Sequence, residues 1–197
     1  MKKIKYILIL IFTININLSV LQSSESCKYK VDKLHKALLI NSKLKKSFQE
    51  KYIYLNEINL KVFNSHKMIR IIYGRKWGNL TENQKTRLSE KFLNYMSYNY
   101  AKRFSELDNA QFIETGIENF GDKKSLVKTY LSVKNEKKVD ISYLCSLEHN
   151  KEWKIFDVII NESISEISTK KSDFAQTISE KGIDGLIEVL DSKMIFD

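Results

Sequence analysis

The chain has 197 residues and a formal net charge of +9, with 33 Lys and Arg against 24 Asp and Glu. It contains no Pro and only six Gly, which argues against a linker-rich or low-complexity protein. Its length suits one domain that has its own apolar core. The basic charge alone fits a nucleic acid, an anionic lipid surface or an acidic protein as partner.

The N-terminus predicts export. Three lysines among the first five residues precede an apolar stretch over residues 6–21, and small residues follow up to Ser26. This pattern is typical of a secretory signal peptide, which we place at residues 1–26, before a single domain over 27–197. A retained anchor is the alternative. A lipoprotein is disfavoured because a polar Ser24 stands three residues before Cys27, and an exported chain excludes nucleic acid as its partner.

Helical periodicity dominates the first half of the chain. Apolar residues spaced three and four apart predict helices over 31–49, 52–59 and 62–74. The clearest helix start is Thr81 with Gln84 three residues later, a capping box from which we expect a helix to about residue 107. One face of this expected helix carries a stripe of apolar and aromatic residues, namely Leu88, Phe92, Tyr95, Met96, Tyr100, Phe104 and Leu107. A stripe of this kind is typical of a core, and it also suits a surface for variable apolar ligands.

After residue 108 the apolar period changes to two, which predicts strands. We expect a four-stranded antiparallel meander, and then helices over 168–181 and 183–190 that are separated by Gly182 as a left-handed cap. Helices, a meander and helices again indicate an α+β fold. The expected strands cover 111–120, 126–133, 139–147 and 153–160.

No enzyme motif is present. There is no G-x-S-x-G, Walker or dinucleotide sequence, so we expect no enzyme, no cofactor and no metal, with a hydrolase of unrecognised type as a weak alternative. His35, His66 and His149 are far apart and are expected on the surface. Cys145 is expected as a core residue and Cys27 as a free thiol, and a disulfide between them is the alternative.

Two polar features near the C-terminus have structural and functional interpretations. Asp157 shares a strand face with Trp153, so we expect a buried carboxylate that organises the turn into the last helices. Lys170 and Lys171 are expected to form a solvated helix face. Docking to an acidic partner or contact with phosphate is the alternative for this pair.

The segment from Trp153 to Leu190 resembles the C-terminal signature of the MlaC family, the periplasmic phospholipid shuttles of Gram-negative bacteria. The family pattern joins a W-x-x-x-D strand, a Val/Ile-Ser pair, a Thr/Tyr-Lys/Arg helix start with Phe or Trp, and a Gly-Ile/Val-Asp-Gly-Leu ending. All four parts occur in order in this chain, as Trp153 with Asp157, Ile164 with Ser165, Thr169 to Phe174, and Gly182 to Leu186.

The resemblance extends upstream to 63–84, FNSHKMIRIIYGRKWGNLTENQ, which is similar to the family's F-x4-M-x5-G-x2-W block followed by Thr and Gln. Phe92, Tyr100 and Ala101 continue the pattern, so the similarity covers nearly all of the predicted mature chain. Two departures concern loops: a Pro common before the Gln is absent, and one extra residue lies between Asp157 and Ser165.

The resemblance implies a monomeric periplasmic lipid carrier without a cofactor. In such a carrier a helical layer on the sheet encloses an apolar pocket for the two acyl chains of a phospholipid. Its partners would be an inner-membrane ABC transporter complex and an outer-membrane lipoprotein complex. With the helical stripe facing the sheet, the residues expected to line this pocket are Ile69, Ile72, Tyr73, Phe92, Met96, Tyr100, Tyr130, Tyr143, Val158 and Ile164.

The basic balance suggests a surface that steers docking to those complexes, since long-range attraction raises encounter rates. We expect Arg75, Lys76 and Arg87 near the helix start at Thr81 to form it, with Arg70 if that side chain faces outward. The alternative to a lipid carrier is an interaction module: a secreted basic protein that binds a protein or polyanion and no lipid.

Overall fold

A computed structural model describes residues 26–105, 107, 109–133 and 138–196 of the chain. All of the predicted signal peptide except Ser26 therefore lies outside the described residues. Among those described, no helix is both long and apolar enough to cross a bilayer. The helices are α1 (Cys27–Lys43), α2 (Phe48–Val62), α3 (Ser65–Tyr73), the 3-10 helix η1 (Gly74–Asn79), α4 (Glu82–Arg103) and α5 (Glu166–Ser192).

The first predicted helix, over 31–49, is in fact two helices. Ser47 accepts a hydrogen bond from the backbone N–H of Glu50, and the Glu50 carboxylate accepts one from the Ser47 N–H. This capping box starts α2, and α1 ends at Lys43. The prediction of one helix is wrong because the apolar period continues across the break between α1 and α2. The break itself is marked only by the two residues of the capping box, Ser47 and Glu50.

The predicted start of α4 is confirmed. The Thr81 hydroxyl accepts from the Gln84 N–H, and the Gln84 side chain accepts from the Thr81 N–H. The helix ends at Arg103, a turn earlier than expected. Before it, α3 begins only at Ser65, because the Asn64 side chain caps it and the preceding Phe63 bridges to Ile155 of the sheet.

The sheet has five antiparallel strands in sequence order, so the α+β class is confirmed and the strand number is corrected from four. The additional strand is only two residues long and pairs with the end of β4, which is too short to give a periodic signal. The strands are β1 (Gln111–Asn119), β2 (Lys124–Ser132), β3 (Val139–Leu147), β4 (Trp153–Ile160) and β5 (Ile164–Ser165).

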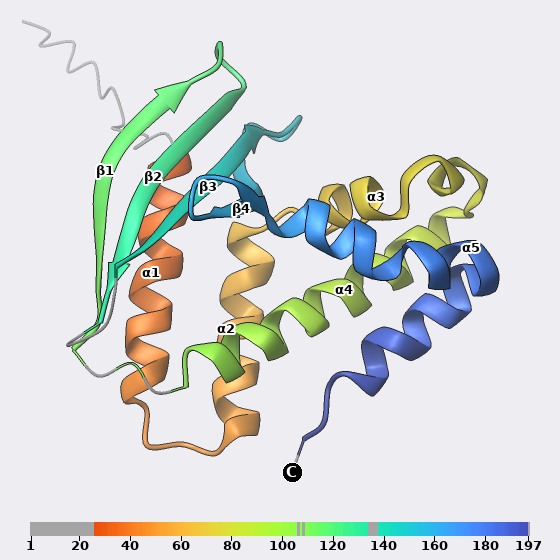
Figure 1. Cartoon of the computed structure of the whole chain (residues 1–197), viewed down its shortest axis with the longest axis horizontal. Helices are drawn as coiled ribbons and strands as arrows, with labels where there is room; N and C mark the ends of the chain where they lie inside the picture. The colour runs from red at the N-terminus through yellow and green to blue at the C-terminus, as the bar shows by residue number, and fades with distance from the viewer. Residues whose placement is uncertain (1–25, 106, 108, 134–137, 197) are drawn as a thin grey trace, which may run out of the picture.

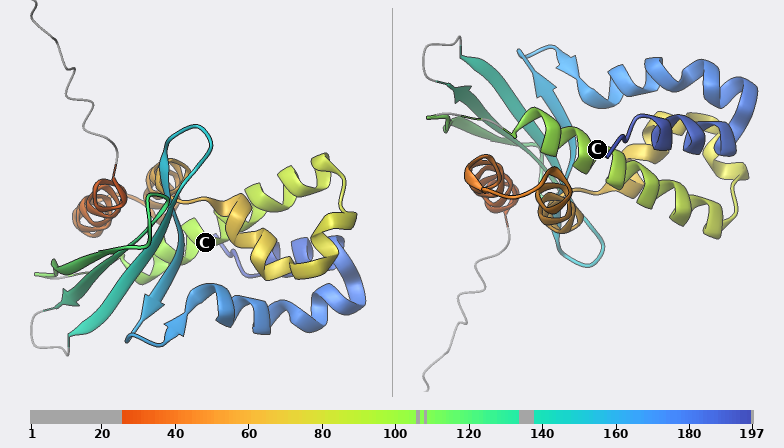
Figure 2. Two further views of the ribbon diagram at one scale, coloured as in Figure 1. Left: turned by 90° about the horizontal axis from the view of Figure 1, so that it is seen from above. Right: turned by 90° about the horizontal axis from the view of Figure 1, so that it is seen from below.

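The helices form two groups around this sheet (Figures 1 and 2). One face of the sheet is covered by α1, which contacts β2, β3 and β4. Beyond the β4 edge, α3, α4 and α5 pack on one another, and α3 and α5 also contact β4. The space between β4 and these three helices is where the predicted apolar face of α4 points.

Asp157 organises the turn from the sheet into α5, as predicted. Its carboxylate accepts hydrogen bonds from the backbone N–H groups of Val158 and Ile167, and from the Ser165 hydroxyl. The Ser165 hydroxyl in turn caps α5 through the Ser168 N–H. This network fixes where α5 begins. The helix then kinks at Gly182, whose φ of 62° is a conformation that glycine adopts readily.

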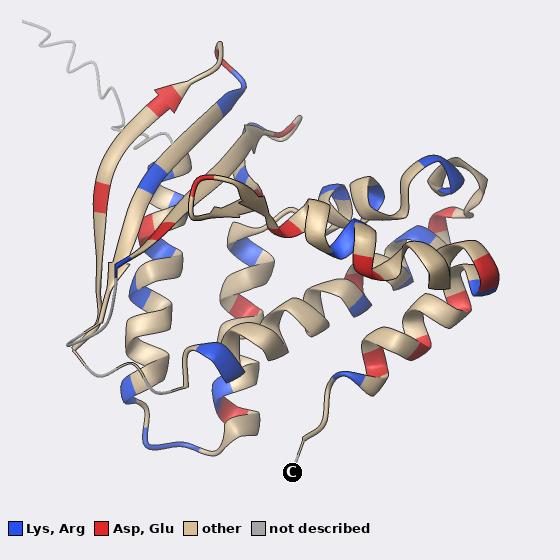
Figure 3. Ribbon diagram, in the orientation of Figure 1, with Lys and Arg blue, Asp and Glu red and all other residues tan. Residues whose placement is uncertain are grey.

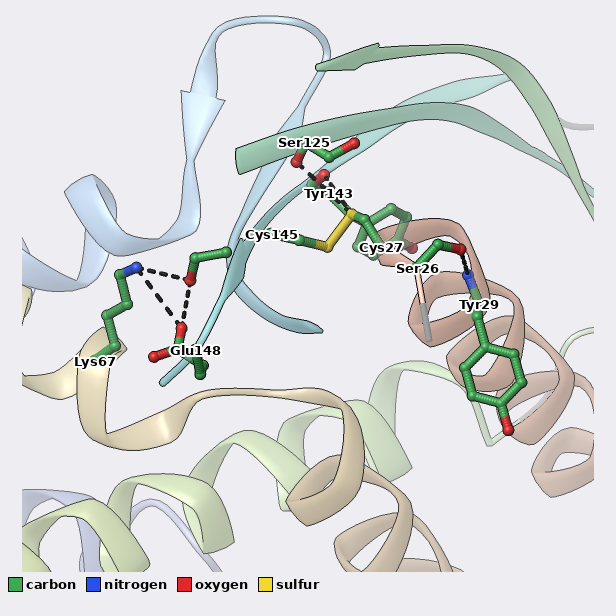
Figure 4. The surroundings of a disulfide bond; sticks show 9 residues. Ser26, Cys27, Tyr29, Lys67, Ser125, Tyr143, Cys145 and Glu148 are labelled. Carbon is green, nitrogen blue, oxygen red and sulfur yellow. Dashed lines mark hydrogen bonds and ion pairs between the residues drawn. A yellow bond between two sulfur atoms is a disulfide. The ribbon is translucent and has the colours of Figure 1, made fainter. Parts of the chain in front are cut away.

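Cys27 and Cys145 form a disulfide with a Cα–Cα distance of 5.7 Å (Figure 4). The expectation of a free Cys27 is therefore wrong. Cys27 is the first residue of α1, and it is buried against β3 where Cys145 is also fully buried. A sulfur in a disulfide cannot carry the thioether of a lipoprotein, which removes that alternative.

His35 is buried, so the expectation that all three histidines lie on the surface is corrected. Its ring stacks on Phe112 at a centroid distance of 3.8 Å, and its Nε2 lies 2.9 Å from the Tyr143 hydroxyl. His66 and His149 are exposed as predicted. Burial lowers the pKa of His35 to about 4, mainly by desolvation of the charged form.

This shift predicts an acid-dependent loss of stability. The unfolded chain takes up the His35 proton near pH 6.5 and the folded chain only near pH 4, so the free energy of unfolding falls as pH drops through that window. The loss amounts to roughly 1.4 kcal/mol per pH unit at most. Urea unfolding of wild type and His35→Gln between pH 7 and 4.5 should show the steeper decline in wild type. Parallel pH profiles would contradict the assignment.

Candidate functional site

An apolar cavity of about 40 Å³ lies between β4 and the helices α3, α4 and α5. Its deep wall is formed by aliphatic, methionine and aromatic side chains, and polar side chains from α4 and α5 lie at its rim. The lining residues are Met68, Ile72, Phe92, Tyr95, Met96, Asn99, Tyr100, Arg103, Val158, Glu166, Ile167 and Lys170.

One face of α4 supplies half of this lining. Phe92, Met96, Asn99 and Arg103 follow one another at spacings of four, three and four residues, which places them along one side of a helix. The face therefore changes from apolar at Phe92 to charged at Arg103, near the end of the helix. Opposite it, Val158 is buried on β4.

The rim is held by charged contacts. Arg103 Nη1 lies 3.2 Å from Glu166 Oε1, so this ion pair joins the last residue of α4 to the first residue of α5. Lys170, one turn further along α5, has its Nζ 3.2 Å from Asp173 Oδ2. The Asn99 side chain donates to the Tyr95 carbonyl at 2.7 Å. The cavity thus combines an apolar interior with two cations at its mouth.

Two titratable groups of the lining, Lys170 and Tyr100, keep their ordinary protonation state at neutral pH. Burial lowers the pKa of Lys170, but Tyr95, Asp173 and Glu166 together outweigh it, so the pKa is raised and the ammonium stays charged. Burial raises the pKa of the Tyr100 hydroxyl, which therefore stays neutral. Neither group is prepared for proton transfer near neutral pH.

The structure gathers half of the residues that the sequence predicts as lipid contacts. Those that line the cavity are Ile72, Phe92, Met96, Tyr100 and Val158.

Three of the other predicted contacts are buried elsewhere. Ile69 is fully buried in the core beside the cavity-lining Met68. Tyr73 packs edge-on against Trp77 at 6.1 Å and borders a surface groove between η1 and α5. Tyr143 lies under α1, with His35 as its hydrogen-bond partner.

The last two predicted contacts also lie outside the cavity lining. Tyr130 lies between the buried Thr129 and Leu131 on β2, so its side chain is on the opposite sheet face, where Lys138 stands 4.4 Å over its ring. Ile164 on β5 is 51% exposed. The expectation that all ten residues line one cavity thus fails for these five positions, and lipid contact by any of the ten stays a prediction.

The predicted contacts did not include Met68, Tyr95 and Ile167. Of the polar rim, only Lys170 was considered, with contact to phosphate as the alternative to a solvated helix face. The signal for Asn99 and Arg103 was present, because both continue the helical spacing of the stripe. Glu166 and Lys170 are likewise one turn apart, but only the tertiary packing of α5 on α4 places them opposite Arg103.

The predicted docking residues are spread over η1 and α4, and Figure 3 shows Lys and Arg distributed over several helices. Arg70 and Arg75 are exposed, and Arg87 is an exposed residue that pairs with Asp184 at 3.4 Å. Lys76 differs, because its Nζ donates to the carbonyl oxygens of Ile178 and Ser179 near the α5 kink. A cation at those carbonyls stabilises a helix end, so Lys76 has a structural role.

Comparison with known proteins gives a family and a solved structure of similar fold. The family model described as MlaC protein matches residues 29–192. Among solved structures, the chain is similar to the phospholipid-binding protein from Ralstonia solanacearum, which was determined in complex with a phospholipid. The two share 20% sequence identity, and the match covers 86% of this chain and 96% of that chain with a TM-score of 0.71. No curated protein matches.

Proposed function

This chain belongs to the MlaC family, and we propose that it binds a phospholipid and carries it through the periplasm. The observation that carries the proposal is the cavity between β4, α3, α4 and α5, whose interior is apolar and whose rim is charged. That arrangement matches a molecule with acyl chains and a phosphate headgroup. The solved relative that binds a phospholipid has the same fold, which supports the proposal.

The energetics favour a reversible carrier. Each buried methylene contributes about 0.8 kcal/mol, so two acyl chains of roughly 15 methylenes would gain on the order of 25 kcal/mol over water. A bilayer offers a similar gain. A protein cavity that matches it lets the lipid move in either direction, without any covalent step.

Lipid entry requires the cavity to widen. Its 40 Å³ is well below the roughly 300–1,000 Å³ typical of ligand pockets. The walls come from four separate elements, and the ion pair of Arg103 with Glu166 joins two of them, α4 and α5, within the lining. We infer that α5 moves away from α4 when acyl chains enter.

A transfer assay tests this function. Purified protein is incubated with donor vesicles that contain a labelled phospholipid and with unlabelled acceptor vesicles. A carrier accelerates movement of label in proportion to its concentration. A rate equal to the protein-free rate would contradict the proposal.

The finer proposal concerns location and partners. The predicted signal peptide supports export to the periplasm, and the partners proposed are an inner-membrane ABC transporter complex and an outer-membrane lipoprotein complex. Arg75 and Arg87, both exposed near the start of α4, are the proposed steering charges of the docking surface. Lys76 is left out of the test because a carboxylate facing the α5 carbonyls would destabilise the fold.

Reversal of these two charges is expected to slow delivery while bound lipid remains. The double variant Arg75→Glu/Arg87→Glu should lower the rate of lipid delivery to membranes that contain the partner complex. Added salt should slow wild type similarly, because exposed charges are screened beyond about 8–10 Å at physiological salt. Lys36→Glu/Lys45→Glu, the same charge change at exposed positions of α1 and the following loop, is the matched control. Equal delivery rates for both double variants would contradict this docking surface.

A further inference from the structure

The cavity lining brings two cations and one carboxylate together. Arg103 and Lys170 are its two cations, and the lining includes only one carboxylate, Glu166, which pairs with Arg103. A guanidinium carries five donors in a planar fork that fits a phosphate, so the contact with Glu166 leaves further donors for a ligand. Among the lining residues alone, the rim therefore has one positive charge in excess over an apolar interior. Lys170 also pairs with Asp173, which lies outside the lining.

Lys170 is placed to act together with Arg103. It lies one turn after Glu166 on α5, so both side chains are on the same helix face, and both line the cavity. The Lys170 side chain is 19% exposed, compared with 56% for Arg103. It is therefore a partly buried cation at the boundary between the apolar interior and solvent. A phosphate located at that boundary would contact both cations while its acyl chains remain in the cavity.

We propose that Arg103 and Lys170 bind the headgroup phosphate, which replaces Glu166 as the partner of Arg103. The cavity then selects lipids that carry a phosphate over diacylglycerols with identical acyl chains. This inference rests on the proposed function, because the acyl chains must occupy the cavity for the phosphate to reach the rim. It adds a headgroup site and a selectivity to that function.

The exchange also couples headgroup binding to opening of the cavity. The pair of Arg103 with Glu166 ties the end of α4 to the start of α5, and both residues line the cavity. Once phosphate takes Arg103, that tie is released. Glu166 then remains in a favourable place, because a carboxylate in the first turn of a helix interacts well with the positive end of the helix dipole.

A competition between two lipids tests the proposal. Each protein is incubated with phosphatidylglycerol vesicles that contain diacylglycerol of the same acyl chains. Bound lipids are then extracted and quantified, and their ratio is divided by that of the vesicles. Wild type should be enriched in phosphatidylglycerol. Arg103→Gln and Lys170→Gln should each lower the enrichment about tenfold, the scale of a lost charge-assisted hydrogen bond, and Glu166→Gln should raise it.

Lys102→Gln and Lys171→Gln are matched controls, because each removes the same charge from an exposed neighbouring position. They should leave the enrichment unchanged. Two results would overturn the headgroup site and leave the carrier function standing. One is that wild type takes up both lipids at the vesicle ratio, and the other is that the rim variants and the controls show equal enrichment. Uptake of neither lipid by folded wild type overturns both.

Discussion

Removal of the Cys27–Cys145 disulfide is expected to lower the free energy of unfolding by about 5 kcal/mol. The bond joins residues separated by 118 positions, and a cross-link over a loop of that length removes much of the conformational entropy of the unfolded chain. Both cysteines are buried, so Cys27→Ala/Cys145→Ala leaves no unpaired polar group in the core. Urea unfolding of this double variant, compared with wild type, gives the difference directly.

Wild type treated with a reductant serves as a control for the substitution itself. It should lose a similar amount of stability, since the same cross-link is removed without changing any side-chain carbon. Because the bond holds the first residue of α1 against β3, hydrogen exchange should rise first in the N-terminal turn of α1. A loss below about 1 kcal/mol, under the 2–5 kcal/mol typical of native disulfides, would contradict this role.

Met96→Trp is expected to reduce bound phospholipid at least tenfold. Met96 lines the cavity from the middle of α4, and an indole there occupies space that acyl chains would need. Overpacking costs about 1–3 kcal/mol of stability, which a domain with a disulfide can tolerate. Quantification of lipid in the purified variant, together with its melting temperature, separates a blocked cavity from an unfolded protein.

Ile164→Trp is the matched control for this variant. It introduces the same side chain at a position that the sequence predicts as a lipid contact and that the structure leaves 51% exposed, outside the cavity. We expect it to keep its lipid. If Met96→Trp retained as much lipid as Ile164→Trp and wild type, the acyl chains would have to bind elsewhere.

Local signals in the sequence were sufficient for most of the fold. The capping box of Thr81 with Gln84 placed the start of α4, and Gly182 marked the kink of α5. The alternation of apolar residues located the four long strands. In each case residues close in sequence carry the information, because a cap or a strand face is defined within a few positions.

What the sequence could not predict depends on contacts between distant segments. The pairing of Cys27 with Cys145 and the burial of His35 beside Tyr143 both result from the packing of α1 on the sheet. Tyr130 is a different case, because the local alternation on β2 already places it on the face opposite to Thr129 and Leu131. The rim, in contrast, depends on contacts between distant segments. Arg103 lies at the end of one helix, and it meets Glu166 only through the packing of α5.

The most direct test is the lipid content of the purified protein. The full chain is expressed in a Gram-negative host, purified without detergent and analysed by mass spectrometry under denaturing conditions. A carrier releases phospholipid in an amount stoichiometric with the protein. Folded protein that holds no phospholipid, even after incubation with phospholipid vesicles, would contradict the carrier function and favour a basic module that binds a protein or polyanion.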